Sequence, residues 1–291
     1  MNWKPMDRIF DAINELRERG TSDFARVVAE YGLLRSPISN VASRNLYWKL
    51  APRYYRWRWP FPEAYAASLD PFKIIWTSPD EINRFSKRQY PQDANASRLF
   101  GTVKSGEWDR RSDIPTRPGY DGTPAYLYHA NSFEETILHR SIKQRFVDEV
   151  PWTETPIVSE ARSLLETERG RWRGCDSEAA IRRRCGEIEK LYHRISEKGY
   201  HTQFELIRQG EVRRVGFLDA LANEILIDIG RDGELLFANG RHRLSIAKIL
   251  EIDVIPVAVL IRHEKWMEKR DQAYRGEVMI NHPDIRTLLD Q

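Results

Sequence analysis

The chain has 291 residues, which is enough for two compact domains or for one domain with a helical extension. Hydrophobic residues make up 41% and charged residues 31%, a balance that excludes a disordered chain. Lys and Arg number 46 against 43 Asp and Glu, so the net charge of +3 excludes nucleic-acid binding through bulk charge, and only a local basic patch could provide it.

The sequence also indicates where the protein resides. No apolar stretch approaches the length of a membrane-spanning helix, and the N-terminus lacks the apolar core of a secretion signal. Cys175 lies just before a predicted helix and Cys185 within it, too far apart to form a disulfide or to share a metal ion. Two cysteines in a chain of this length suit a reducing compartment, so we expect a cytoplasmic protein with no membrane span.

Residues 1–66 are predicted to form a helical N-terminal region, with helices up to about residue 20, at about 22–33 and near 45–55. The region ends with Arg53–Phe61, RYYRWRWPF, in which aromatic residues alternate with arginines. Such a segment can stack on nucleic-acid bases, lie on a membrane surface, or pack helices against a neighbouring domain while the arginine heads stay in solvent. We favour packing, because the segment is short and lies at a predicted domain boundary.

Residues 67–157 are predicted to form an α/β segment that packs with the core. The run 72–77 is a predicted strand, after which Ser78 and Glu81 form a capping box at the start of a helix. A second capping box, Ser132 with Glu135, predicts the start of another helix. Residues 151–156, PWTETP, are a candidate linker.

Between these two helices a loop carries a possible ligand-facing cluster. Glu107 and Asp109 flank Trp108 directly after a Gly turn. Loops of this kind carry function more often than regular elements do. A turn with a packed tryptophan fits the same residues, and we favour it.

Residues 158–291 are predicted to form a mixed-sheet domain. Asp176 is the predicted cap of a long helix whose arginine triplet, residues 182–184, is interpreted as a solvated face. After that helix, alternating residues predict a β-hairpin of Gln203–Arg208 and Glu211–Phe217.

The most informative stretch follows the predicted hairpin. Apolar runs predict strands at 224–229, 234–238 and 257–261, with a helix over 241–250. Asn239-Gly240 is a tight turn between strand and helix, where glycine permits a positive φ or the approach of a ligand. Amides at a helix N-terminus bind anions, and Arg241, His242 and Arg243 add donors at the same place. The pattern favours a phosphate-binding corner.

The segment Gly240-Arg241-His242-Arg243 resembles the signature of the ParB/sulfiredoxin fold family, which includes free serine kinases. Sulfiredoxins have Gly-Cys-His-Arg, the kinases Gly-His-His-Arg and ParB proteins Gly-Glu-Arg-Arg at this place. The resemblance covers roughly the last third of the chain and implies that Gly240 and Arg243 hold nucleotide phosphates. At the position of Arg241, sulfiredoxins have their catalytic cysteine and ParB proteins have a glutamate. This difference implies that sulfiredoxin activity is absent, and it puts ParB-type hydrolysis in doubt.

The family resemblance implies an α+β fold and a nucleotide ligand, ATP, ADP or CTP with Mg²⁺. The implied function is phosphoryl transfer to a small-molecule acceptor or nucleotide hydrolysis, in which Asn239 belongs to the phosphate-binding set. His242 is the candidate that positions or protonates a phosphate oxygen. The candidate carboxylate bases are Asp228, Glu107 and Asp109. The possible substrate-side residues are Glu107, Trp108 and His263.

Two other functions stay open. ParB-like domains are also associated with DNA binding and with nuclease activity, and a nucleotide-sensing switch without turnover fits the same residues. The even charge balance and the lack of a recognisable helix-turn-helix after the motif disfavour DNA. The histidines lack metal-ligand spacing with any acid or cysteine, so we expect no metal site made by the protein alone.

Overall fold

The computed structural model describes residues 41–58, 65–88, 99–113, 126–167, 171–212 and 215–289, without the side chains of 41–45, 58 and 287–289. The two helices expected before residue 40 and the end of the 53–61 segment lie outside the described residues. The chain divides into two compact units, one of residues 1–60 with 204–220 and the other of residues 61–203 with 221–291.

In the first unit, helix α3 (Val41–Arg58) confirms the predicted helical character of the N-terminal region. Tyr47, Ala51 and Tyr55 recur every fourth residue and are buried, which is the spacing of one helix face. The Tyr47 hydroxyl accepts a hydrogen bond from the backbone N–H of Phe217 at 2.8 Å, and the Tyr55 ring stacks on Phe217. The 53–61 segment is therefore divided, since Tyr55 packs inward while Trp57 is 76% exposed.

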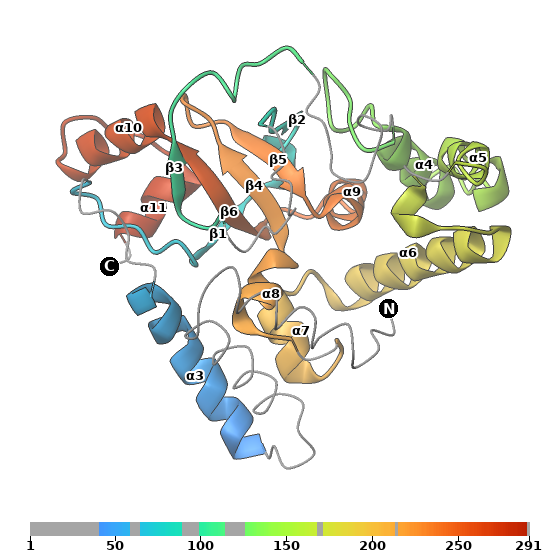
Figure 1. Cartoon of the computed structure of the whole chain (residues 1–291), viewed down its shortest axis with the longest axis horizontal. Coiled ribbons are helices and arrows are strands. Elements are labelled where there is room, and N and C mark those ends of the chain that lie inside the picture. Colours follow the sequence, from blue (N-terminus) through green and yellow to red (C-terminus); the bar gives the residue numbers. More distant parts are fainter. Residues whose placement is uncertain are drawn as a thin grey trace. The chain divides into compact units, whose positions relative to one another are not determined.

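The second unit is built on one mixed sheet (Figure 1). Its strand order is β1-β6-β4-β5-β2, and β3 pairs with β6 as well. β6 runs parallel to β4 and β3 and antiparallel to β1, while β5 runs antiparallel to β4 and parallel to β2. The strands are β1 (Ile74–Thr77), β2 (Arg84–Phe85), β3 (Thr102–Lys104), β4 (Ile225–Ile229), β5 (Leu235–Asn239) and β6 (Ile255–His263). This architecture confirms the predicted α+β class.

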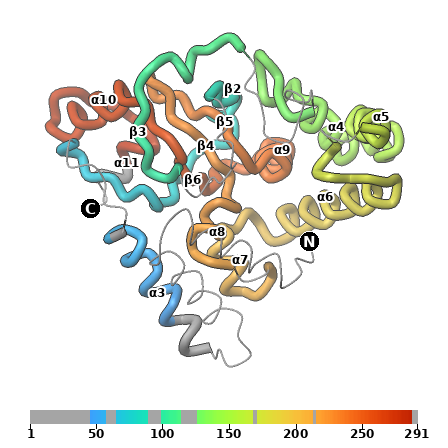
Figure 2. The backbone as a smooth tube through the Cα atoms, in the orientation of Figure 1, coloured from blue at the N-terminus to red at the C-terminus, as the bar shows by residue number. Residues whose placement is uncertain are grey.

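Helix α9 (Arg241–Ile249) links the sheet to a group of helices within the same unit (Figure 2). Leu244 and Ala247 join the sheet's hydrophobic core, while Ile246 joins the core of the helical group. That group consists of α4 (Ile137–Phe146), α5 (Pro156–Ser163) and α6 (Glu178–Lys198), with the 3-10 turns η3 (Trp152–Glu154) and η4 (Trp172–Gly174). Beyond β6, α10 (Glu264–Tyr274) and α11 (Pro283–Leu289) contribute Trp266 and Ile285 to the sheet core.

The predicted hairpin at 203–217 is wrong. The structure has helix α7 (Gln203–Gln209) at the first predicted strand, and helix α8 (Phe217–Ala222) begins at the last residue of the second. Phe204 and Leu206 alternate as in a strand, but Phe204 and Ile207 lie three residues apart, the spacing of a helix face. A short apolar run fits both the two-residue period of a strand and the 3.6-residue period of a helix, and this run forms a helix.

Several predicted helix starts are shifted. The cap of α4 is Thr136, four residues after the predicted cap Ser132, and the Ser132 hydroxyl donates to the Asn83 side chain at 2.8 Å. α6 is capped by Ser177 rather than Asp176. Ser78 is a cap as predicted, but the helix it begins is the single 3-10 turn η1 (Pro79–Glu81).

Candidate anion-binding site

The turn between β5 and α9 depends on a glycine for two reasons. Gly240 has φ 94°, and a Cβ there would lie 2.9 Å from the Cα of Ile225. β4 therefore passes so close that a side chain at position 240 has no room. Asn239 closes the turn by accepting a hydrogen bond from the Gly240 N–H at 2.9 Å. Asn239 and Gly240 together determine the conformation of the turn. β4 occupies the space that a side chain at position 240 would need.

Past the turn, the three basic residues of α9 lie largely inside the protein. Arg241 and His242 are buried, and the Arg243 side chain is 15% exposed. Arg243 lies 3.6 Å from the Glu224 carboxylate, between Nη1 and Oε2. Glu224 is fully buried and also accepts from the backbone N–H of Gln203 at 2.6 Å. The corner thus holds a buried glutamate that the sequence analysis assigned only to the start of a strand.

A fourth basic residue reaches the corner from α6. Nη2 of Arg184 lies 3.3 Å from Nδ1 of His242, and Nη1 of Arg184 is 2.6 Å from Glu187. Arg182 and Arg183 are exposed, whereas the Arg184 side chain is only 19% exposed. The interpretation of the triplet as a solvated face is therefore wrong for Arg184.

The electrostatics of His242 follow from this surrounding. Burial holds its pKa well below 6.5, and the charges of Arg184, Arg173, Arg241 and Arg243 lower it further. The imidazole is consequently neutral. Its Nδ1 faces an arginine N–H and so acts as the acceptor, which places the hydrogen on Nε2. Nε2 is buried and has no hydrogen-bond partner among the described residues.

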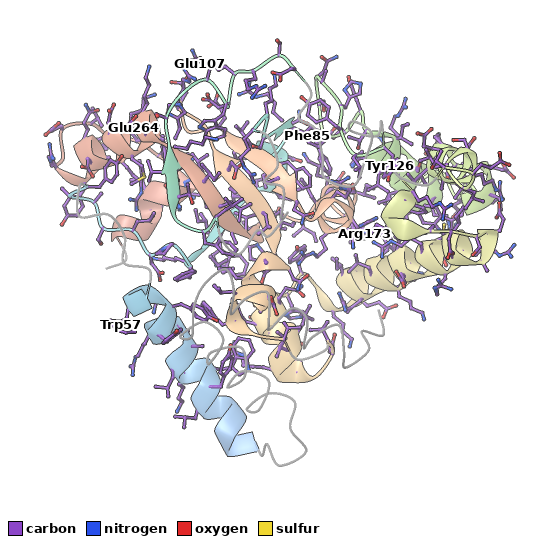
Figure 3. All side chains as sticks on the ribbon, in the orientation of Figure 1. Trp57, Phe85, Glu107, Tyr126, Arg173 and Glu264 are labelled. Atoms are coloured by element: carbon purple, nitrogen blue, oxygen red, sulfur yellow. The ribbon has the colours of Figure 1, made fainter. Side chains whose placement is uncertain are left out.

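Arginines from three elements gather around His242. Arg173, whose backbone is strained at φ 48°, belongs to turn η4, and Figure 3 shows it on the side of α6 toward α9. Two glutamates pair with arginines of the corner, Glu224 with Arg243 and the half-exposed Glu187 with Arg184. We call the set Arg184, Glu224, Arg241, His242 and Arg243, together with the start of α9, the basic corner.

The other candidate residues lie at the opposite end of the sheet. Ile225, beside Gly240, pairs with Val257 at the start of β6, and His263 ends that strand six residues later. At the strand rise this is roughly 20 Å. Figure 3 shows the labelled Glu107 far from Arg173 in the same way. The structure does not bring His263 to the same corner as His242.

At that far end the predicted loop residues form a closed network around Arg231. Arg231 binds Asp109 through Nε at 2.9 Å and Nη2 at 2.7 Å, and it also reaches Glu107 at 2.9 Å. Burial raises the pKa of Asp109, but hydrogen bonds from Arg231 outweigh it and hold the value at about 2. Trp108 stacks on His263, whose Nε2 lies 2.8 Å from the Gly106 carbonyl. These residues fasten the loop after β3 to the end of β6.

Asp228 is placed in the middle of the sheet, where it is fully buried. Its carboxylate accepts hydrogen bonds from the Ser86 hydroxyl, from Nε of Arg88 at 2.6 Å and from the backbone N–H of Ile261 at 3.2 Å. The pairing of β4 with β6 shifts register between Ile227 and Ile229, so Asp228 satisfies a backbone group beside the irregularity. Its contacts are those of a structural residue, remote from the corner.

A separate pocket of about 360 Å³ lies in the same unit. Its lining includes Arg84, Glu234 and His282. Arg84 pairs with Glu234 at 2.7 Å, and Nε2 of His282 lies 2.8 Å from the Gly233 carbonyl. These polar groups already have partners, whereas Nε2 of His242 at the basic corner has none among the described residues.

Metal and thiol chemistry have little support in the parts of the chain that the structure describes. There, no three or more histidine, cysteine or acidic side chains gather as a metal ion would need. Cys175 and Cys185 are buried thiols in the helical core, and burial raises the pKa of Cys185 to about 11. In the same ranges, no helix combines the length and apolarity needed to span a bilayer.

Comparison with known proteins adds nothing to this geometry, because no family model, curated protein or solved structure matches the chain.

Proposed function

We propose that the chain binds a nucleoside di- or triphosphate through its phosphates at the basic corner. The observation that carries the proposal is the buried Nε2 of His242, an N–H donor that lies near four arginines and has no partner among the described residues. An unsatisfied buried donor costs folding free energy, and a bound phosphate would accept a hydrogen bond from it. The N-terminal amides of α9 point the same way, since they attract anions.

Burial of the corner favours a small anion over a nucleic-acid duplex. The residues of a duplex-binding surface must be exposed to reach a continuous phosphate backbone. Arg241 and His242 are less than a tenth exposed, so a narrow terminal phosphate group fits better. At moderate salt, a gel-shift assay is expected to show no sequence-preferring DNA complex. Weak binding that falls steeply with salt would be attributed to the exposed Arg53 and Arg56 of α3.

Binding has more support than turnover does. Phosphoryl transfer needs a base near the acceptor, and the expected bases Asp228 and Asp109 are engaged elsewhere in the fold. Glu224 is the carboxylate at the corner, and it pairs with Arg243. If Mg²⁺ accompanies the nucleotide, oxygens of the nucleotide phosphates and water would provide most of its ligands. A nucleotide-sensing switch and a kinase or hydrolase that uses Glu224 both follow from the same binding site.

The test is a calorimetric titration with ATP, ADP and CTP, with and without Mg²⁺. Arg243→Ala is expected to lose about 1.5–3 kcal/mol of nucleotide affinity, the typical contribution of a charged hydrogen bond. Arg243→Lys keeps a charge opposite Glu224 but cannot bind two phosphate oxygens as a fork, so it should recover part of the loss. Arg275→Ala, which removes a 56% exposed arginine at the C-terminal cap of α10, is the matched control and should bind as the wild type does. Unchanged affinity in a folded Arg243→Ala variant would refute the proposal.

A further inference from the structure

Arg184 provides a second set of donors, on a different helix from the motif. It lies on α6, some sixty residues before Gly240, and only the fold brings its Nη2 to 3.3 Å from His242. Its Nε is buried without a hydrogen-bond partner in the described part of the chain, as are Nε2 of His242 and Nη1 of Arg243. The three donors come from two helices that meet at the Arg184–His242 contact, and among the described residues Nη1 of Arg243 has only the 3.6 Å ion pair with Glu224.

A purely structural role would leave the placement of Arg184 unexplained. Its one carboxylate partner here, Glu187, is 53% exposed and one turn along the same helix, so that pair can form with the arginine in solvent. The guanidinium instead turns toward a histidine whose other neighbours are Arg173, Arg241 and Arg243. In that position Nε of Arg184 is buried and has no partner among the described residues, and a bound anion would give this donor an acceptor.

The number of donors indicates the kind of anion. A single phosphate group offers three strong acceptor oxygens. The amides of the first turn of α9 and two N–H groups of the Arg243 guanidinium are enough to bind those three oxygens. The donors of Arg184 and the Nε2–H of His242 then remain for a further group. Because side chains at 242 and 243 leave the helix about 100° apart, His242 reaches a position next to the phosphate that Arg243 binds.

We propose that Arg184 is a ligand-binding residue of the basic corner, and that Arg184 with His242 holds the second phosphate of a diphosphate group. This inference rests on the proposed function. It assigns the second phosphate of the proposed ligand to Arg184 and His242, so any molecule with two linked phosphates should bind more tightly than a phosphate monoester.

Inorganic phosphate and pyrophosphate, titrated without a nucleoside, test the inference by calorimetry. The wild type should bind pyrophosphate at least about tenfold more tightly than phosphate. Arg184→Ala should remove that preference by weakening pyrophosphate alone, and Arg184→Lys should restore part of it. Arg183→Ala, the exposed neighbour in the triplet, should change neither affinity.

The melting temperature without ligand separates ligand binding from packing. Arg184→Ala removes a buried donor that has no partner among the described residues, so its melting temperature should equal or exceed that of the wild type. A lowered melting temperature with both affinities unchanged would overturn the inference and make Arg184 structural. Equal binding of the two anions, lost in Arg243→Ala but not in Arg184→Ala, would refute the diphosphate inference while leaving the proposed function intact. No binding of either anion would count against both.

Discussion

Buried ionisable side chains in this protein differ in how fully their polar atoms are bonded. Asp228 has a partner for each carboxylate oxygen, from a hydroxyl, a guanidinium and a backbone amide. His242 and His139 each keep one ring nitrogen that is buried and has no partner in the described ranges. Complete bonding, as in Asp228, is typical of residues that hold a fold together. A buried nitrogen without a partner marks a position where protonation or ligand binding changes the stability of the folded protein.

Asp228→Asn tests the structural role at the residue scale. The substitution removes the charge opposite Arg88, whose side chain is 6% exposed. Breaking a buried ion pair from one side typically costs about 3–5 kcal/mol of unfolding free energy, measurable by urea denaturation. Nucleotide affinity of the molecules that remain folded should not change. A variant of wild-type stability that had lost a nucleotide-dependent reaction would instead restore Asp228 as a catalytic base.

His139 predicts how stability depends on pH. Burial lowers its pKa from 6.5 to about 4; the charge of Glu134 opposes this shift, and the charges of Lys248 and Lys143 add to it. Between these values the unfolded chain binds one more proton than the folded chain, so stability falls as pH drops from 6.5 toward 4. This group alone contributes a slope of up to about 1.4 kcal/mol per pH unit.

Urea unfolding between pH 7 and pH 4.5 measures that slope. His139→Gln should flatten it by about one proton, whatever the variant's stability at pH 7. His242 and His282, whose pKa values are also lowered, should contribute to the slope that remains, and carboxylates with lowered pKa values, such as Glu134, should add to it near pH 4.5. An unaltered slope in the variant would show that His139 is protonated in the folded protein.

At the scale of elements, the turn into α9 is where glycine is required. Gly240 and Gly106 both have φ above 90°, but a Cβ at Gly106 would meet nothing within 4 Å. Gly106→Ala should therefore lower the free energy of unfolding through backbone strain alone, by more than roughly 0.4–1 kcal/mol. Gly240→Ala adds a clash with the β4 backbone and should be clearly less stable in the same urea assay. Equal losses would mean that β4 moves aside at no cost.

How far the sequence predicts these elements depends on the length of the pattern. The β4–β5–α9–β6 order was predictable, because each apolar run is bounded by a Gly or Pro turn signal. The six-residue run at 203–208 fits a strand and a helix equally, and its neighbours decide between them. Glu224 reaches the corner through the β4–β5 pairing register, which no local pattern specifies.

Arg184 is a different case, because a local signal was present. It lies three residues after Ile181 and four before Ile188, both buried, so it belongs to the inward stripe of α6. Reading the arginine triplet as one block hid the fact that its third member faces inward. Its partner His242 was still beyond prediction, since their contact depends on how α6 packs against α9.

At the scale of the whole chain, a net charge of +3 conceals a local concentration of positive charge. Several arginines gather around one neutral histidine, while most acidic residues are elsewhere. Such a field draws small anions toward the corner without giving the protein a general affinity for polyanions. The absence of bulk charge and the presence of an anion site are therefore compatible.

Crystals grown with ADP test the central claim most directly. The account predicts phosphate density at the start of α9, within hydrogen-bond distance of Nε2 of His242 and a terminal nitrogen of Arg243. It further predicts Arg184 on the second phosphate. Well-defined nucleotide density elsewhere, such as the pocket beside Arg84 and His282, with the basic corner filled by protein or water alone, would contradict it.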